Sequence, residues 1–144
     1  MKSYHYRRPQ MGDIVQIQRL LEELGYDVDE QRLENRVASL LESNDFVLVA
    51  EHQGRLDGII QCLIESRLAE GVVGEIVTLV VTKAARRTGL GKTLLTKAIN
   101  SLDASGCELI IVRTNEVRVT AKAFYHSQGF IEVKKQRVFE LRVS

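Results

Sequence analysis

Apolar residues recur every three or four positions in two stretches near the start of the chain, which predicts two amphipathic helices. Asp13 and Gln16 form the pattern of a capping box at the start of the first helix, and Gly25 ends it. The second helix is expected from Asp29 to Glu42. The apolar faces consist of Ile14, Ile17, Leu20, Leu21 and Leu24 in the first helix and of Leu33, Val37, Leu40 and Leu41 in the second.

Runs rich in β-branched and aromatic residues predict strands around these helices. A first strand is expected from Tyr4 to Arg8, because Pro9 lacks the N–H that a ladder needs. Gln53-Gly54 separates two further runs and predicts a hairpin. Gly71 and Gly74 are expected to bracket a loop. The other strands are expected over 46–52, 56–66, 75–82, 107–114, 130–133 and 137–143.

The strand over 75–82 is apolar almost throughout, which predicts burial on both of its faces. A glycine-containing loop and a helix that ends near Gly106 connect it to the strand over 107–114, so these two strands should run parallel. A short helix from Thr120 to Gln128, ended by Gly129, follows. The sequence therefore predicts an α/β fold in which a mixed sheet carries helices on both faces.

Composition limits the class of protein. A chain of 144 residues, 44% apolar and 27% charged, is expected to form one globular domain. Its longest apolar runs are of strand length, and its first ten residues lack the apolar core of a secretion signal, so we expect a cytoplasmic protein without a membrane partner. Cys62 and Cys107 lie too far apart for a zinc site or a disulfide framework, and we expect both to be reduced and buried.

The net charge of +1 argues against a nucleic-acid partner, but the charges are unevenly distributed. From Leu20 to Asp45 there are eight acidic and two basic residues, so this part could favour a cation or could be a solvated helix surface. From Thr82 to Ile99 there are five basic residues and none is acidic. This second region is expected to favour an anion.

The basic region contains the segment RRTGLGKTLL, which has the character of a phosphate-binding loop. A nucleotide-triphosphate loop requires a glycine where Arg86 stands, and a dinucleotide loop requires one where Leu94 stands. What remains is R-x-x-G-x-G over 86–91, directly after a strand and opening a helix. Glycines there let the main chain approach an anion, and the helix N-terminus attracts it.

Together with its surroundings, this loop resembles that of the GNAT superfamily of N-acetyltransferases, [QR]-x-x-G-x-[GA] after a strand of the type E-I-x-x-L-x-V. The matching stretch runs from Glu75 to Leu95. Thr114-Asn115 with Arg118, and the segment Ala123 to Phe130, are similar to further family motifs. The start of the chain also fits, so nearly all of it is covered. The resemblance implies a single GNAT-like domain over 1–144 with a mostly antiparallel sheet and two parallel strands that splay apart.

The resemblance implies acetyl-CoA as co-substrate. Its pantetheine would pair with the main chain of the strand, its pyrophosphate would lie on the loop, and an asparagine after the next strand would contact it. The family often has proline where Lys83 stands and glycine where Arg87 stands, which affects the contacts to adenine and the 3′-phosphate. The implied coenzyme-binding residues are Leu79, Val80, Val81, Arg86, Arg87, Thr88, Gly89, Leu90, Gly91, Lys92, Thr93 and Asn115.

Transfer to a primary amine by direct attack requires a proton acceptor and a proton donor. Glu75 matches the base of some family members, although it could instead bind a cationic substrate or be a solvated strand residue. Tyr125 matches the tyrosine that protonates the leaving thiolate, although a packed aromatic is the alternative. No Ser-His-Asp or Cys-His set stands out, and the three histidines are expected to be structural.

The acceptor is expected to be a small-molecule amine, such as an aminoglycoside, a polyamine or an aminoalkyl compound. The motifs around Asn115 and Tyr125 also resemble those of small-molecule acetylators, including those that act on aminoalkylphosphonates. A protein or peptide amine is the alternative, and a homodimer is also open. A non-catalytic module that binds acetyl-CoA, and a nucleotide-triphosphate switch built on Gly91-Lys92-Thr93, are rivals from other classes. No metal is expected.

Overall fold

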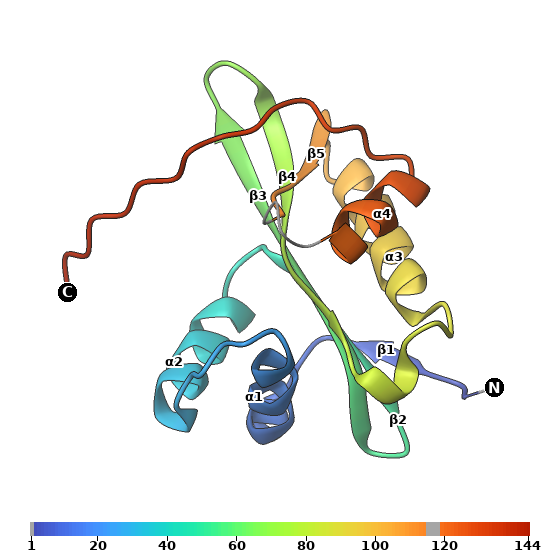
Figure 1. The fold of residues 1–144 in the computed structure, drawn as a ribbon. Helices are drawn as coiled ribbons and strands as arrows, with labels where there is room; N and C mark the ends of the chain where they lie inside the picture. Colours follow the sequence, from blue (N-terminus) through green and yellow to red (C-terminus); the bar gives the residue numbers. More distant parts are fainter. Residues whose placement is uncertain (1, 115–118) are drawn as a thin grey trace. The chain divides into compact units, whose positions relative to one another are not determined.

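The computed structural model describes residues 2–114 and 119–144, so the predicted contact Asn115 and the motif residue Arg118 lie outside the described residues. The chain divides into two compact units, Met1–Arg113 and Thr114–Ser144, and each is described by itself (Figure 1). Within the described ranges, no helix is both long and apolar enough to cross a bilayer.

The N-terminal unit contains a five-stranded sheet in the order β1-β2-β3-β4-β5. Neighbouring strands are antiparallel except for β4 and β5, which are parallel as the helical crossover between them requires. The predicted mixed sheet is therefore confirmed. The elements are β1 His5–Arg7, η1 Met11–Asp13, α1 Ile14–Glu23, α2 Glu30–Leu41, β2 Phe46–His52, β3 Arg55–Arg67, β4 Gly71–Val81, η2 Lys83–Ala85, α3 Leu90–Ala104 and β5 Leu109–Val112.

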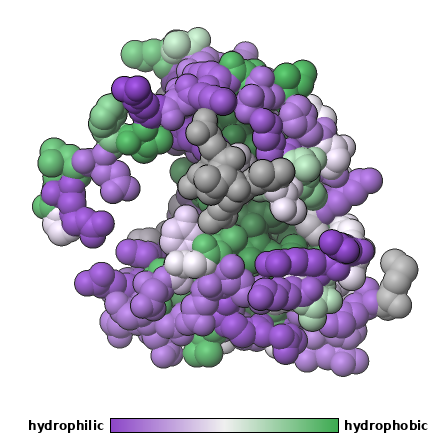
Figure 2. Space-filling model, viewed as in Figure 1, coloured by the Kyte–Doolittle hydropathy of each residue, from purple (hydrophilic) through white to green (hydrophobic). Residues whose placement is uncertain are grey.

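Helices α1 and α2 cover one face of this sheet (Figure 1). The predicted second helix is confirmed as α2, and the Asp29 carboxylate caps it by accepting a hydrogen bond from the Arg32 N–H at 2.8 Å. Leu20 is fully buried in the core between α1, α2 and the sheet, and such burial contributes about 2 kcal/mol. The outward side of these helices is largely hydrophilic (Figure 2).

The predicted capping box between Asp13 and Gln16 is wrong. The buried Asp13 carboxylate accepts two hydrogen bonds from the Arg7 guanidinium, at 2.7 and 2.9 Å, and one from the Gln10 N–H. Gln16 instead bonds to the β2–β3 hairpin, where its Oε1 accepts from the Leu56 N–H. Charge-assisted bonds are roughly twice as strong as neutral ones, so Arg7 outcompetes the helix. The same bonds from Arg7 lower the pKa of Asp13, although burial opposes the shift.

Helix α3 covers the opposite face of the sheet, so the prediction of helices on both faces is confirmed. Two glycines allow its close approach, because a Cβ on Gly58 would lie 2.9 Å from Leu94 Cδ1 and one on Gly74 would lie 2.8 Å from Leu102 Cδ1. Strand β4 begins at Gly71 and includes Gly74, so the predicted loop bracketed by these two glycines is wrong. The glycine at position 74 is required by the packing of α3 and not by a turn.

Replacing Gly74 by alanine is expected to destabilise the fold by about 2 kcal/mol, since the new methyl group would overpack a fully buried Leu102. Gly12→Ala is the matched control, because a Cβ on Gly12 meets no atom within 4 Å. Chemical denaturation of both variants measures the difference. Equal stabilities would contradict this account of the α3 contact.

Strand β4 contains a β-bulge just before its second half. Gln61 pairs with Thr78 and Cys62 with Ile76, which leaves Val77 as the extra residue. Ile76 is buried, but Val77 is 43% exposed, so the predicted burial on both faces fails at this position. The bulge lies next to the point where β4 loses its parallel neighbour, as described below.

The C-terminal unit consists of α4 Val119–Ser127 followed by an extended segment. Gly129, at φ +94°, ends the helix as predicted. The strands predicted over 130–133 and 137–143 are wrong, because the described residues after α4 are in no ladder. Alternating apolar residues favour an extended chain, but a strand also needs a paired neighbour. The large apolar side chains of this segment are 78–88% exposed and can be followed in Figure 2.

Candidate active site

The phosphate loop, residues 86–91, joins η2 to α3. Arg86 is extended, Arg87 has a left-handed φ of +63°, and Gly89 has a φ of +87° and immediately precedes α3. Glycine accepts this left-handed conformation without strain, and a Cβ on Gly89 would meet no atom within 4 Å. The main chain at Gly89 is therefore bordered by open space, which an anion could occupy.

The first turn of α3 supplies free donors to this space. Thr93 closes the first helical bond by donating from its N–H to the Gly89 carbonyl at 3.0 Å, and its hydroxyl donates to the same oxygen. Gly89 has no side chain with which to cap the preceding N–H groups. Arg86, Arg87 and Lys92 are exposed and add positive charge. Donors and charge together make this helix end suited to a diphosphate.

Strands β4 and β5 part at a defined position. Their parallel pairing runs from Val73–Leu109 to Ile76–Val112 within the described residues, whereas β4 continues to Val81. The last part of β4 thus has an edge that β5 does not cover. This geometry agrees with the two splayed parallel strands that the family resemblance implied.

The alternation of the ladder decides which main-chain groups lie on that edge. The Thr82 N–H donates to the Asp57 carbonyl at 2.9 Å, so Thr82 and Asp57 form a hydrogen-bonded pair in the register that also pairs Val80 with Ile59. Alternate pairs along an antiparallel ladder are hydrogen-bonded. The N–H and C=O groups of Leu79 therefore point to the open edge, as do those of residue 81, while those of Val80 face β3.

Glu75 lies one residue before Ile76, the last residue of β4 that pairs with β5, and on the face of the sheet opposite α3. The side chain is buried, and its carboxylate forms ion pairs with Arg113 at 3.0 Å and with Arg67 at 3.3 Å. Arg67 also pairs with Glu65 at 2.7 Å and with Glu70 at 2.9 Å. Sequence reasoning identified Glu75 but missed both arginines, since cross-strand register alone brings them to it.

Tyr125 lies in α4, in the C-terminal unit. Its ring makes edge contacts with Phe124 and Phe130, at centroid separations of 5.2 and 5.5 Å. The aromatic packing expected as the alternative role is thus present, and it fixes the ring orientation within this unit. The structure does not relate Tyr125 to the phosphate loop or to Glu75, because these residues belong to different units.

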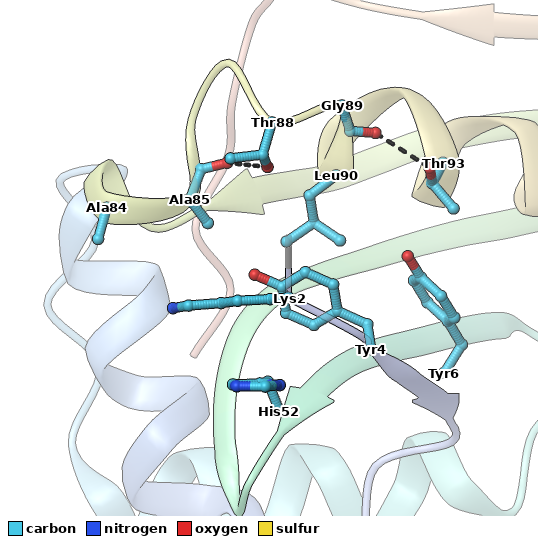
Figure 3. A pocket seen from close by; sticks show the side chains of 10 residues that line it. All are labelled: Lys2, Tyr4, Tyr6, His52, Ala84, Ala85, Thr88, Gly89, Leu90 and Thr93. Carbon is cyan, nitrogen blue, oxygen red and sulfur yellow. Dashed lines mark hydrogen bonds between the residues drawn. The ribbon is translucent and has the colours of Figure 1, made fainter.

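A hollow of about 580 Å³ lies beside the phosphate loop. Figure 3 shows side chains of the N-terminal segment and of β2 on one side and the loop with the first turn of α3 on the other. We name it the tyrosine hollow after its ring-lined wall. That wall consists of Lys2, Tyr4, Tyr6 and His52.

A buried carboxylate supports this wall. Asp57 on β3 accepts a hydrogen bond from the Tyr4 hydroxyl at 2.7 Å and pairs with Lys2 at 3.3 Å and Arg55 at 3.4 Å. Burial and the bond to Asp57 raise the pKa of Tyr4 to about 12. Burial acts to raise the pKa of Asp57, but the bonds from Tyr4 and Lys2 outweigh it and leave that pKa below its usual value. An aspartate inside the apolar run LDGII was the signal available in the sequence.

The cysteines differ from each other in their surroundings. Cys62 is fully buried on β3, and burial raises the pKa of its thiol to about 12, so it stays protonated and unreactive. Cys107 is only partly buried and precedes β5 rather than lying in it, which corrects the expectation of two buried strand residues.

The comparisons with known proteins agree with this geometry. A family model described as an acetyltransferase (GNAT) domain matches residues 12–141. The chain therefore belongs to the GNAT acetyltransferase family, whose transfer reaction uses acetyl-CoA. One similar curated protein is the N-alpha-acetyltransferase MAK3 of Arabidopsis thaliana, 33% identical over 87 residues that make up 60% of this chain. The match spans 45% of that protein, so this chain covers about half the length of the curated relative.

Solved structures show the same fold. An acetyltransferase of Trypanosoma brucei has a TM-score of 0.81 and 25% identity, and the match covers 96% of this chain and 100% of the other. The aminoglycoside N-acetyltransferase AAC(6')-Iy, in complex with CoA, has a TM-score of 0.87 at 15% identity with 99% and 97% covered. Glucosamine-6-phosphate N-acetyltransferase of Arabidopsis thaliana has a TM-score of 0.82 at 20% identity with 98% and 100% covered.

Proposed function

We propose that this protein acetylates a primary amine of a small molecule, using acetyl-CoA directly and without an acyl-enzyme. One observation carries the proposal: among the described residues β5 leaves β4 uncovered after Ile76, so the open edge begins just beyond Glu75 and extends to Val81, a few residues before the phosphate loop. A diphosphate on the loop and an extended pantetheine along Leu79 and Val81 would bring the thioester to the place where β4 and β5 part. The main chain of Val80 faces β3 and its side chain is buried in the core beneath α1 and α2, so we assign Val80 no direct contact with the coenzyme.

The reaction forms a C–N bond and breaks a C–S bond. An alkylammonium has a pKa of about 10.4, so the free amine costs roughly 4 kcal/mol at neutral pH and its proton needs an acceptor. We assign this role to Glu75, whose carboxylate forms ion pairs with Arg67 and Arg113 close to the point where β4 and β5 part. Because both arginines contact the carboxylate, a bridging water is expected to carry the proton to it. Tyr125 would return a proton to the departing thiolate.

Glu75→Gln is expected to lower kcat/KM about tenfold at neutral pH, because the amine must then lose its proton to solvent. The loss should shrink as the pH is raised toward the pKa of the amine. Glu65→Gln is the matched control, since Glu65 also pairs with Arg67 but has no proposed proton role. A loss of equal size at every pH, together with a lower melting temperature, would assign Glu75 a structural role.

The similar proteins support two kinds of acceptor, a small-molecule amine and a protein N-terminus. The small-molecule assignment is supported by the aminoglycoside and glucosamine-6-phosphate acetyltransferases among the structural relatives. A protein N-terminus is the second candidate, because the curated relative MAK3 is named an N-alpha-acetyltransferase. The acidic surface of α1 and α2 fits a cationic acceptor and equally a solvated face.

A titration with acetyl-CoA followed by a panel of acceptors tests the proposal. Acetyl-CoA is expected to raise the melting temperature, and a small amine is expected to release free thiol faster than any peptide. Thiol release with peptides alone would favour the second candidate. Binding of acetyl-CoA without thiol release from any amine would mean a binding module, and no binding at all would overturn the coenzyme assignment.

A further inference from the structure

Arg113 stands at the opening between β4 and β5. Ile76 and Val112 are the last residues that pair the two strands, and Arg113 directly follows Val112. Glu75 is paired with Ile111, and side chains two residues apart lie on the same face of a strand, so Arg113 shares the face of Glu75. Their ion pair at 3.0 Å agrees with this placement. Arg113 therefore borders the place where, under the proposed function, the amine must reach the thioester.

The two arginines that contact Glu75 differ in how much of their hydrogen-bonding capacity is used. Arg67 donates from Nε and Nη2 to Glu65 and from Nη1 to Glu70. Its Nη2 also donates to Glu75 at 3.3 Å, and its side chain is 25% exposed. All three nitrogens of this guanidinium thus bond to carboxylates of the protein, which leaves Arg67 little capacity for a ligand.

Arg113 contacts Glu75 with a single nitrogen of its guanidinium. Nη1 donates to both carboxylate oxygens, at 3.0 and 3.3 Å, whereas Nε and Nη2 make no hydrogen bond within the part of the chain that the structure describes. The Arg113 side chain is 55% exposed, against 9% for that of Glu75. Nε and Nη2 form a planar fork that matches two oxygens of a carboxylate or a phosphate. A ligand that enters from solvent therefore meets this fork before it meets the Glu75 carboxylate.

We propose that the amine acceptor carries an anionic group, a carboxylate or a phosphate ester, and that the Nε–Nη2 edge of Arg113 binds it. The inference rests on the proposed function, since it seats the acceptor on the face of the sheet where Glu75 lies. The amine faces Glu75 and the anion lies on Arg113. Because these two side chains are in contact, the amine and the anion of the acceptor are separated by only a few bonds.

This arrangement gives Arg113 a role in specificity. A charge-assisted, two-point contact is stronger than a neutral hydrogen bond and also fixes the direction of the bound group. An acceptor with an anion gains this contact and has its amine oriented toward the thioester. A neutral amine leaves the fork to water and gains neither.

Paired acceptors that differ in the anionic group test the inference. β-Alanine is compared with β-alaninamide, and phosphoethanolamine with ethanolamine, by kcat/KM from thiol release, expressed per free amine. The wild-type protein is expected to favour the anionic member of at least one pair by about tenfold or more, and the favoured pair identifies carboxylate or phosphate. Arg113→Gln is expected to abolish most of this preference. Arg113→Lys, which keeps the charge without the fork, should retain part of it.

Arg67→Gln is the matched control, because Arg67 also pairs with Glu75 but its donors are taken up by carboxylates. It should leave the preference within each pair unchanged, whatever its effect on the rate. No wild-type preference in either pair, equal losses for both members of a pair in Arg113→Gln, or thiol release from other amines but from none of these would overturn the inference. Thiol release from no amine at all would instead overturn the proposed function.

Discussion

The Gly89→Asp variant is expected to bind acetyl-CoA at least about a hundredfold more weakly than the wild-type protein. The new carboxylate would stand at the N-terminus of α3, in space that is open to a ligand. It would occupy the donors proposed for the diphosphate and would repel the negative charge of the coenzyme. Titration calorimetry with acetyl-CoA measures the loss.

The control for this variant is Gly106→Asp, at the other end of α3. Gly106 has a φ of +89°, and a Cβ on Gly106, like one on Gly89, would meet no atom within 4 Å. Both substitutions impose left-handed backbone strain of about 1 to 3 kcal/mol. A carboxylate is favoured at a helix N-terminus and disfavoured at the C-terminus, so Gly106→Asp should lower the free energy of unfolding at least as much as Gly89→Asp does. Only Gly89→Asp should change coenzyme affinity. If both variants bind acetyl-CoA as the wild type does, the phosphate loop has been assigned wrongly.

Replacing Tyr125 by phenylalanine is expected to lower kcat about a hundredfold while the Kd for acetyl-CoA stays the same. The hydroxyl is the proposed proton donor to the thiolate, and phenylalanine keeps the ring that packs against Phe124 and Phe130. Steady-state thiol release gives kcat, and calorimetry gives the Kd. The separation of the two constants distinguishes a chemical role from a packing role.

Tyr26→Phe serves as the control, since it removes a hydroxyl from an exposed tyrosine far along the sequence from any proposed site residue. An unchanged kcat in Tyr125→Phe would remove the proton donor from the mechanism. A lower melting temperature with proportional losses of kcat and coenzyme affinity would point to packing alone.

Local patterns predicted those parts of the fold that local interactions decide. The helical periodicity around Leu20 and Leu33 placed α1 and α2 correctly, and Gly106 marked the end of α3. Errors arose where a distant partner decides the structure. The Asp13 carboxylate bonds to Arg7 of β1 instead of capping its own helix. Gly74 makes room for the side chain of Leu102, which lies 28 residues further along the chain.

The candidate site followed the same division. The phosphate loop is contiguous, so its glycines and the helix that follows could be recognised in the sequence. The partners of Glu75 are Arg67, the last residue of β3, and Arg113, which directly follows β5, and only the register of the sheet brings them together. The ring-lined wall likewise combines the first residues of the chain and β1 with the end of β2. Such sets have no spacing signature in a single sequence.

Arg87 adopts a backbone conformation that disfavours any residue with a side chain, at a cost of about 1 to 2 kcal/mol. Folding by itself gains nothing from the arginine, because glycine would fit there more easily. Under the proposed function, the Arg87 guanidinium would attract the incoming diphosphate. The strain at this position would then be a loss of stability that is offset only when the coenzyme binds.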